Sequence, residues 1–373
     1  YLNGSDPWRN EPLASTESRP ELFRRSGYKT FGAGKLFHAK TTTEKWGNAW
    51  DNKTPKGGFG PFPPEGDQIA GKFWGVTEWE GSDTDFPDVN NAGQTIAFLE
   101  YAHEKPFFLC YGLWRPHTPF TAPKRFFDLY DPTDIPVPPP GYASEDLADV
   151  PEAGRRLSDI WSQRWSVSGG AHADRWRRLL HGYLATTSFA DWNVGRVIEA
   201  LDRSPHADNT IVIFWSDNGY HMGEKNHYEK ATLWEKSAYT PLAIRVPGSP
   251  HNGKTCTRPV GSIDLFPTIK DYCSLLDTRH ALDGQSLRPL LDQPKKVWNR
   301  PALTAYGEDM FSLRTERYRY IRYSDGSEEL YDHQTDPHEK QNMVGRPEAE
   351  AVIQKLKHLL PRIWTKSLGG RNG

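Results

Sequence analysis

The sequence predicts an α/β protein built on a doubly wound, mostly parallel sheet, followed by a small C-terminal α+β subdomain. Three observations carry this prediction. Short apolar runs typical of buried strands recur along the first 250 residues, helical patterns separate them, and beyond about residue 300 apolar residues alternate as in antiparallel strands. The chain has 373 residues, enough for one large domain with a smaller appendage. We therefore expect an α/β domain over residues 1–298 and a C-terminal subdomain over 299–373.

The strands of the large domain are expected where apolar and aromatic residues run without interruption. These segments are 28–32, 106–113, 210–215 and 241–246. Amphipathic segments between and after them predict helices over 20–26, 91–103, 174–203 and 264–276. Because strands alternate with helices, we expect all four strands to be buried and parallel.

The remaining segments predict loops and a small second sheet. Two long stretches rich in Gly, Pro and Trp, about 39–90 and 131–172, show little periodicity and are expected to form the rim of a substrate site. Antiparallel strands are expected over 311–316, 318–323 and 328–332, with a hairpin turn at 324–327 and a closing helix over 347–360.

Composition and charge exclude several classes of protein. The net charge of −2 gives no basic field for nucleic acid, and no apolar run approaches the ~18 residues of a membrane span. The three cysteines show no metal-binding spacing and are too few for a disulfide framework. We therefore expect neither a nucleic-acid nor a membrane partner, and the oligomeric state stays open.

One strand ends on residues suited to a metal ion. Asp217 and Asn218 directly follow the strand 210–215, at the edge where open α/β sheets bind their ligands. A carboxylate and an amide oxygen are hard ligands that suit Ca²⁺, or less well Mg²⁺. A plain Asp-Asn-Gly turn is the alternative interpretation.

Basic residues follow the first three predicted strands. Lys35 and His38 come after the first strand, His117 lies between two prolines after the second, and Lys230 closes a polar loop after the third. Each is unremarkable alone. Together with a divalent cation they predict an electropositive pocket for a tetrahedral oxyanion, as in sulfate or phosphate ester hydrolysis.

Longer segments around these residues resemble a known family, over nearly the whole length of the chain. The segments SGYKTFGAGKLFH, KPFFLCYGLWRPHTPF, SDNGYHMGEKNHYEKATLWEKSAYTPLAIRVPG and SLRTERYRYIRY are similar to the type I sulfatases of the alkaline phosphatase superfamily. GEKNHYEK and the GK-L-FH spacing are closest to the iduronate-2-sulfatase-like branch, which acts on sulfated sugars. The resemblance implies a sulfuric ester hydrolase acting on sulfated saccharides, and a periplasmic or secreted location, since this family is exported.

The resemblance also implies a role for each matching residue. Asp217 and Asn218 match two ligands of the family's Ca²⁺, while Lys35 and Lys230 match lysines that hold sulfate oxygens. His38 matches a histidine beside the nucleophile. The other matches are His117, a sulfate-contacting histidine and general acid, and Lys225 and His227, in the loop expected to line the sugar subsite.

The chain departs from the family pattern at the nucleophile. Sulfatases of this type make a formylglycine from a C-x-P-S-R motif and take two further Ca²⁺ ligands from an Asp-Asp pair. Cys110, Cys256 and Cys273 do not lie in such a motif, and no such pair is present. We therefore expect a truncated sequence or a chain completed by another polypeptide, inactive by itself. The alternatives are a phosphoester or phosphonate hydrolase on the same scaffold, and a non-catalytic protein that binds sulfated glycans.

Overall fold

The computed structural model describes six stretches of the chain and groups the chain into two compact units. The described residues are 16–36, 49–54, 57–69, 71–136, 145–162 and 172–361. The N-terminal unit comprises residues 18–139 and 164–210, and the C-terminal unit comprises 1–17, 140–163 and 211–373. Each unit is described by itself below. The boundary expected at residue 298 stays a prediction.

A three-stranded parallel sheet organises the N-terminal unit. Its strands lie in the order β2 (Asn52–Lys53), β1 (Lys29–Gly34) and β4 (Phe107–Gly112), with β1 in register against β4 along its whole length. Gly112 ends β4 where a Cβ atom would lie 2.0 Å from the carbonyl oxygen of Lys35. This glycine therefore allows the chain leaving β1 to pass directly over the end of β4.

Two helices cover opposite faces of this sheet. Phe23 of α2 (Arg19–Arg25) stacks on Phe108 at a ring-centroid distance of 4.0 Å, whereas Phe98 of α4 (Pro87–Glu100) stacks on Phe31 at 4.5 Å. Phe31 is opposite Leu109 in the β1–β4 register, and successive side chains alternate faces, so Phe108 and Phe31 point to opposite sides. The unit is therefore doubly wound, as predicted.

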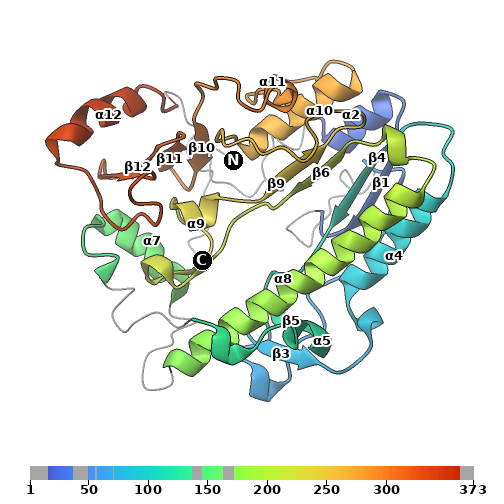
Figure 1. The fold of residues 1–373 in the computed structure, drawn as a ribbon, viewed down its shortest axis with the longest axis horizontal. Coiled ribbons are helices and arrows are strands. Elements are labelled where there is room, and N and C mark those ends of the chain that lie inside the picture. The colour runs from blue at the N-terminus through green and yellow to red at the C-terminus, as the bar shows by residue number, and fades with distance from the viewer. Residues whose placement is uncertain are drawn as a thin grey trace. The chain divides into compact units, whose positions relative to one another are not determined.

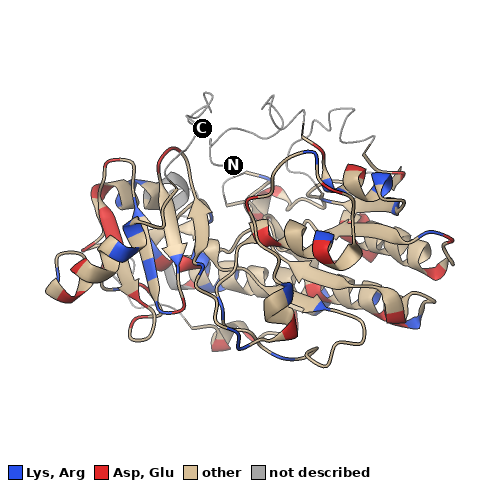
Figure 2. Ribbon diagram, turned by 90° about the horizontal axis from the view of Figure 1, so that it is seen from above, with Lys and Arg blue, Asp and Glu red and all other residues tan. Residues whose placement is uncertain are grey.

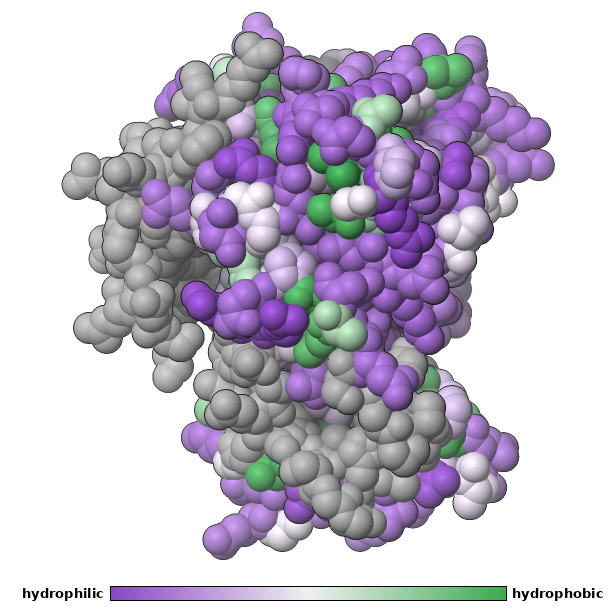
Figure 3. Space-filling model, turned by 90° about the vertical axis from the view of Figure 1, so that its left-hand side faces the viewer, coloured by the Kyte–Doolittle hydropathy of each residue, from purple (hydrophilic) through white to green (hydrophobic). Residues whose placement is uncertain are grey.

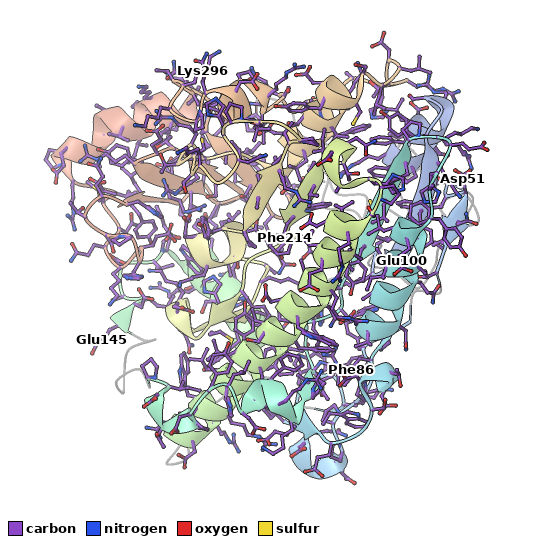
Figure 4. All side chains as sticks on the ribbon, turned by 45° about the vertical axis from the view of Figure 1, so that its right-hand side comes forward. Asp51, Phe86, Glu100, Glu145, Phe214 and Lys296 are labelled. Atoms are coloured by element: carbon purple, nitrogen blue, oxygen red, sulfur yellow. The ribbon has the colours of Figure 1, made fainter. Side chains whose placement is uncertain are left out.

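The long predicted helix is confirmed as α8 (His172–Arg203), which lies beside α4 in Figure 1. Phe86, labelled in Figure 4, precedes α4 and packs against Phe189 of α8 at 4.8 Å. Beneath α8, β3 (Val76–Trp79) pairs in parallel with β5 (Phe120–Pro123), followed by α5 (Lys124–Phe127). Strand β3 lies in the stretch 39–90, which was predicted to have little regular structure, and β5 lies outside every predicted element, so sequence periodicity missed both.

The C-terminal unit contains the other two predicted strands, and here one expectation is wrong. β6 (Val212–Trp215) and β9 (Leu242–Arg245) form an antiparallel pair, so they cannot both run parallel to the other strands. They are also not fully buried, because Phe214, labelled in Figure 4, is 43% exposed and Trp215 is 39% exposed. An apolar run shows that a strand favours burial, but neither its pairing direction nor what covers it.

The antiparallel C-terminal sheet is confirmed. Its strands lie in chain order as β10 (Ala302–Ala305), β11 (Phe311–Arg314), β12 (Tyr318–Arg322) and β13 (Glu328–Asp332), of which β10 was not predicted. The turn expected at 324–327 is present, with Gly326 at φ 84°. The closing helix α12 (Pro347–Lys357) packs Ile353 and Leu356 into the same core as Leu313 and Leu330.

Short elements complete the described residues. In the C-terminal unit they are α7 (Glu152–Ser162), β7 (His221–Met222), β8 (Tyr228–Glu229), α9 (Glu235–Ala238), α10 (Leu265–Cys273) and α11 (Arg288–Asp292). Single 3₁₀ turns are at Glu65–Asp67, Asp83–Asp85, Pro132–Asp134, Ala207–Asn209, Glu224–Asn226 and Ser262–Asp264.

The surface is polar and carries charges of both signs. Acidic and basic residues are interspersed over the elements of Figure 2, and hydrophobic residues on the face of Figure 3 form small separate patches among hydrophilic ones. Among the described helices, none has the length and hydrophobicity needed to cross a bilayer.

Candidate functional site

The turn after β6 presents two oxygen ligands. The backbone N–H of Gly219 donates to the carbonyl of Ser237 at 2.8 Å, and a Cβ at Gly219 would lie 2.1 Å from the Lys236 carbonyl oxygen. Asn218 uses its amide nitrogen to donate to the Gly219 carbonyl at 2.8 Å, which turns its Oδ1 atom away from that bond. Asp217 is exposed, and no described residue donates to its carboxylate or to Asn218 Oδ1. These two hard oxygens fit a divalent cation.

The loop 223–231 has an unusual backbone. Apart from Gly223, four of its residues have positive φ: Lys225 at 55°, Asn226 at 50°, Glu229 at 75° and Ala231 at 77°. Positive φ is uncommon for residues other than Gly, and several such residues in one loop require surrounding contacts that compensate the strain. Strained backbone of this kind concentrates at functional sites, and Lys230 lies between two of these residues.

Lys225 is one source of those contacts. Its side chain is 2% exposed, and Nζ lies 3.0 Å from the Asp146 carboxylate, itself 4% exposed. Nζ also donates to the carbonyl oxygens of Asp146 and Glu339, and it lies 5.2 Å from the ring centroid of Tyr331. Every donor of the ammonium group therefore has an internal acceptor. This burial does not fit the prediction that Lys225 contacts the sugar, because the side chain does not reach solvent.

His227 is the second source, and it is completely buried. One ring nitrogen, Nδ1, lies 2.9 Å from the carbonyl oxygen of Ser158 in α7, and Nε2 lies 2.7 Å from the carbonyl oxygen of Lys230. His227 therefore connects the backbone of Lys230 to a helix. The prediction that it lines the sugar subsite does not fit either, since the imidazole is enclosed.

His221 packs edge-on against His227, with ring centroids 5.1 Å apart. It is fully buried between the Glu224 carbonyl and the Thr232 hydroxyl, at 3.1 and 3.0 Å. Burial, followed by the charge of His227, holds the pKa of His221 well below its usual 6.5. His221 is thus a neutral packing partner of the loop.

Lys230 differs from these neighbours. It is half-buried, its carbonyl is held by His227, and within the described ranges no carboxylate lies at ion-pair distance from its ammonium group. A lysine whose backbone is fixed and whose charge has no internal partner is suited to bind an external anion.

The C-terminal sheet supports the residues that follow this loop. The Trp234 indole donates to the buried Glu329 carboxylate at 2.9 Å, and the hydroxyls of Tyr323 and Tyr331 donate to the same carboxylate. Burial raises the pKa of Glu329 although these hydrogen bonds oppose the shift. The chain after Lys230 is therefore attached to β13 by a satisfied polar network.

In the N-terminal unit, Lys35 follows β1 directly. Its backbone N–H donates to the Gly112 carbonyl at 2.8 Å, and its ammonium group lies 5.3 Å from the ring of Trp114 and 5.8 Å from that of Phe59. The ammonium is thus held against aromatic faces by cation–π attraction.

His117 reaches the same phenylalanine from the end of β4. Its ring lies 4.8 Å from Phe59, and its Nδ1 donates to the Thr118 carbonyl at 2.8 Å. That bond directs the Nε2 side of the half-buried imidazole away from the backbone. The structure therefore brings Lys35 and His117 together around one aromatic ring, and their role in binding sulfate stays a prediction.

Two fully buried charges hold the loop that carries His117. Asp88 of α4 accepts the backbone N–H groups of Trp114 and Arg115 at 2.8 and 3.0 Å, and burial raises its pKa. The Arg115 guanidinium donates to the carbonyls of Thr121 and Phe59 at 2.9 and 2.8 Å. Burial lowers the pKa of Arg115 to about 10, so it stays charged at neutral pH.

Sequence reasoning missed Phe59, Asp88, Arg115 and Asp146. Arg115 could have been found in LWRPHTPF beside His117, but the others lie far from any predicted site residue and act through tertiary contacts. His38 lies outside the described residues, so its position stays a prediction.

A cluster of Glu235, His333 and Glu339 also brings possible ligand atoms within 4.8 Å of one another. Arg319 pairs with both glutamates, so the carboxylates of this cluster already have a positive partner within the protein.

Comparison with known proteins identifies the family. The sulfatase family model matches residues 2–274, and the model for the C-terminal region of N-sulphoglucosamine sulphohydrolase matches residues 223–366. A sulfatase of Formosa agariphila is 34% identical over 95% of this chain and 71% of its own length. Human iduronate 2-sulfatase is 29% identical over 68% of this chain.

The chain spans 48% of the human protein and 61% of a 28% identical arylsulfatase of Clostridium perfringens. Among solved structures, a protein in complex with its substrate D-glucosamine-2-N,6-O-disulfate shares the fold with a TM-score of 0.71 at 22% identity, covering 93% of this chain and 81% of that one. The phosphonate monoester hydrolase of Agrobacterium radiobacter has the same TM-score at 20% identity, over 93% of this chain and 80% of its own. Family model, relatives and fold agree that the chain belongs to the sulfatase family.

Proposed function

We propose that the polypeptide containing this chain hydrolyses sulfate esters of sulfated saccharides. The observation that carries the proposal is Lys230, a lysine with a fixed backbone and no internal counter-charge within the described residues. Relatives named for iduronate, N-acetylglucosamine and ulvan substrates support the saccharide class. We also infer export to the periplasm or the exterior, from the bacterial relatives.

Asp217 and Asn218 would hold the divalent ion that sulfatases generally use, and we infer Ca²⁺, because both are hard oxygen ligands. When bound, the ion supplies positive charge that stabilises the developing negative charge on sulfate oxygens.

The other predicted site residues have two roles, which are to bind sulfate and to transfer protons. Lys35 and Lys230 bind sulfate oxygens through their ammonium groups. His117 donates a proton from Nε2 to the leaving saccharide oxygen, with its Nδ1 side fixed on the Thr118 carbonyl. His38 is proposed to remove a proton when sulfate leaves the enzyme, in keeping with its position in the GK-L-FH motif.

The nucleophile of this proposal is not one of these 373 residues, since none of Cys110, Cys256 and Cys273 lies in a C-x-P-S-R motif. The activity is therefore assigned to the natural gene product. Its intact mass and N-terminal sequence identify the nucleophile, because conversion of cysteine to formylglycine changes the mass.

The test is turnover by the natural gene product on an aryl sulfate and on matched phosphate and phosphonate esters. We expect preference for sulfate, loss of at least 10²-fold in kcat for Lys230→Met, and wild-type kcat for Lys254→Met, an exposed lysine of the same unit. Chelation is expected to abolish turnover and Ca²⁺ to restore it better than Mg²⁺. Preference for phosphate or phosphonate esters, or full activity of Lys230→Met, would overturn the proposal.

A further inference from the structure

An aromatic cluster with a lysine above it extends from the corner that carries Lys35 and His117. We call Phe59, Phe62, Phe73 and Lys72 the aromatic shelf. Phe73 packs edge-on against Phe59 and Phe62, with ring centroids 5.5 and 5.2 Å away, and the Lys72 ammonium lies 5.1 Å from the Phe62 ring and 5.4 Å from the Phe73 ring. The rings and the ammonium thus form one continuous surface in the N-terminal unit.

The outer part of the shelf is open to solvent. Phe62 is 37% exposed and Lys72 is exposed, and across the described stretches no carboxylate pairs with Lys72. An exposed ring beside an unpaired cation is the combination that recognises a ligand with an apolar face and a negative charge.

The shelf is built on a fixed frame. The buried Arg115 donates from Nη2 to the carbonyls of Phe59 and Pro61 at 2.8 and 3.4 Å, which ties one end of the shelf to the loop of His117. At the other end, the Ile69 N–H donates to the Trp74 carbonyl at 2.7 Å and the Trp74 N–H donates to the Gly71 carbonyl at 2.9 Å, which fixes the backbone on both sides of Lys72 and Phe73. A frame of this kind lowers the entropic cost of binding a ligand.

Phe59 links the shelf to the predicted sulfate-binding groups. Its ring contacts His117 at 4.8 Å, the ammonium of Lys35 at 5.8 Å, and Phe73 at 5.5 Å. A ligand whose sulfate lies at Lys35 and His117 therefore has the shelf directly beside it, on the side of Phe73 and Phe62.

We propose that the aromatic shelf is a subsite for a neighbouring anionic sugar residue of an oligosaccharide substrate. The apolar face of that sugar packs on Phe62, and its sulfate or carboxylate pairs with Lys72. This inference rests on the proposed function, and it adds that the enzyme recognises a charged chain rather than a single sulfated sugar.

The experiment compares binding with small-substrate turnover in the full-length protein. Heparin, chondroitin sulfate and ulvan tetrasaccharides are titrated against wild type, Phe62→Ala and Lys72→Ala by calorimetry, and aryl sulfate hydrolysis is measured in parallel. We expect at least one tetrasaccharide to bind, and each variant to weaken its Kd about tenfold. The kcat/KM for aryl sulfate is expected to stay within about twofold, since a small substrate does not reach the shelf.

Matched controls come from the same unit. Tyr101→Ala removes an aromatic ring that is 71% exposed and Lys105→Ala removes an exposed lysine, and both are expected to bind as wild type does. Raising the salt concentration is expected to shrink the Lys72→Ala effect more than the Phe62→Ala effect, because only the charge pair is screened.

The outcomes separate the two proposals. If no tetrasaccharide binds, or if both variants bind as tightly as the controls, the shelf is not a subsite, whatever the aryl sulfate activity. If both variants lose aryl sulfate turnover and oligosaccharide binding to the same degree, the shelf acts only by supporting His117 and the inference is wrong. If wild type binds through the shelf but never cleaves a sulfate ester, the proposed function fails and the subsite stands.

Discussion

The loop 223–231 of the C-terminal unit and the corner 113–121 of the N-terminal unit use the same residue types in opposite ways. In the loop, His227 and Lys225 are buried and bonded to carbonyls and a carboxylate, and they hold a third residue, Lys230, in place. In the corner, a buried Asp88 and Arg115 hold the backbone, while the histidine, His117, stays half-buried against Phe59.

This comparison shows that residue type does not by itself reveal a role at a site. A histidine whose two ring nitrogens both face carbonyl oxygens of the chain has no nitrogen left for a ligand. His117, by contrast, has Nδ1 on the Thr118 carbonyl and keeps part of its imidazole exposed to solvent. Four predictions test whether Lys225 and His227 stabilise the fold while Lys230 and His117 act on a ligand.

The largest effect is expected for Lys225→Met. It leaves the buried Asp146 carboxylate without its counter-charge, with only the backbone N–H of residue 225 still donating to it, which costs about 3–5 kcal/mol of unfolding free energy. The matched control is Lys236→Met, since Lys236 pairs with Glu224 at 3.5 Å at a half-exposed surface position, where loss of a pair costs below about 1 kcal/mol. Urea unfolding measures both. Equal losses in the two variants would show that the Lys225 pair is not part of the loop's internal support.

The second largest effect is expected when the histidine of each region, His227 in the loop and His117 in the corner, is replaced by alanine. His227→Ala removes two carbonyl partners and leaves a cavity, and is expected to cost about 2–4 kcal/mol, whereas His117→Ala should cost about 1 kcal/mol or less. In the natural gene product, His117→Ala is nonetheless expected to lower kcat about 10²-fold as a lost general acid. A His117→Ala protein that is strongly destabilised but fully active would show that His117 stabilises the fold and takes no part in catalysis.

A third prediction concerns pH and His221. Because burial lowers the folded-state pKa of His221 well below 6.5, the unfolded chain binds a proton there at a higher pH than the folded chain does. The unfolding free energy therefore keeps its full contribution from neutral His221 above pH 6.5. Below pH 6.5 this contribution falls by about 1.4 kcal/mol per pH unit, until the lowered pKa of the folded state is reached. His221→Gln should flatten this slope between pH 6.5 and 5 while leaving the shape above pH 7 unchanged. Denaturant midpoints across pH 5 to 8 give the answer, and an unchanged slope in the variant would assign it to other groups.

The smallest effect on stability is expected for Lys230→Met. Its ammonium group has no partner within the described residues, and methionine keeps the methylene packing, so the unfolding free energy should change by less than about 0.5 kcal/mol. The contrast with Lys225→Met, five positions away, is the sharpest form of the comparison. A loss of several kcal/mol would mean that the Lys230 ammonium is bonded inside the protein and is not presented to a ligand.

Much of the fold could be predicted because it depends on local pattern. The helix α8 has apolar residues at helical spacing over its length, and the strands β11, β12 and β13 alternate around a turn that needs Gly326 at positive φ. The antiparallel pairing of β6 with β9 could not be predicted in this way, because hydrogen bonding between distant strands leaves no periodic mark on either one.

The same distinction between local sequence and tertiary contacts applies to the candidate site. The sequence by itself determined which side chains can bind an oxyanion and a cation, because lysine, histidine, aspartate and asparagine carry those donors and acceptors wherever they lie. Only the tertiary structure decided that Lys225 and His227 brace the loop while Lys230 does not, and that Lys35 and His117 share the ring of Phe59. The physical reason is that burial and hydrogen-bond partners determine whether a charged or polar group is satisfied within the protein or remains available to a ligand. Those partners come from residues far away in the chain, such as Asp146 and Ser158.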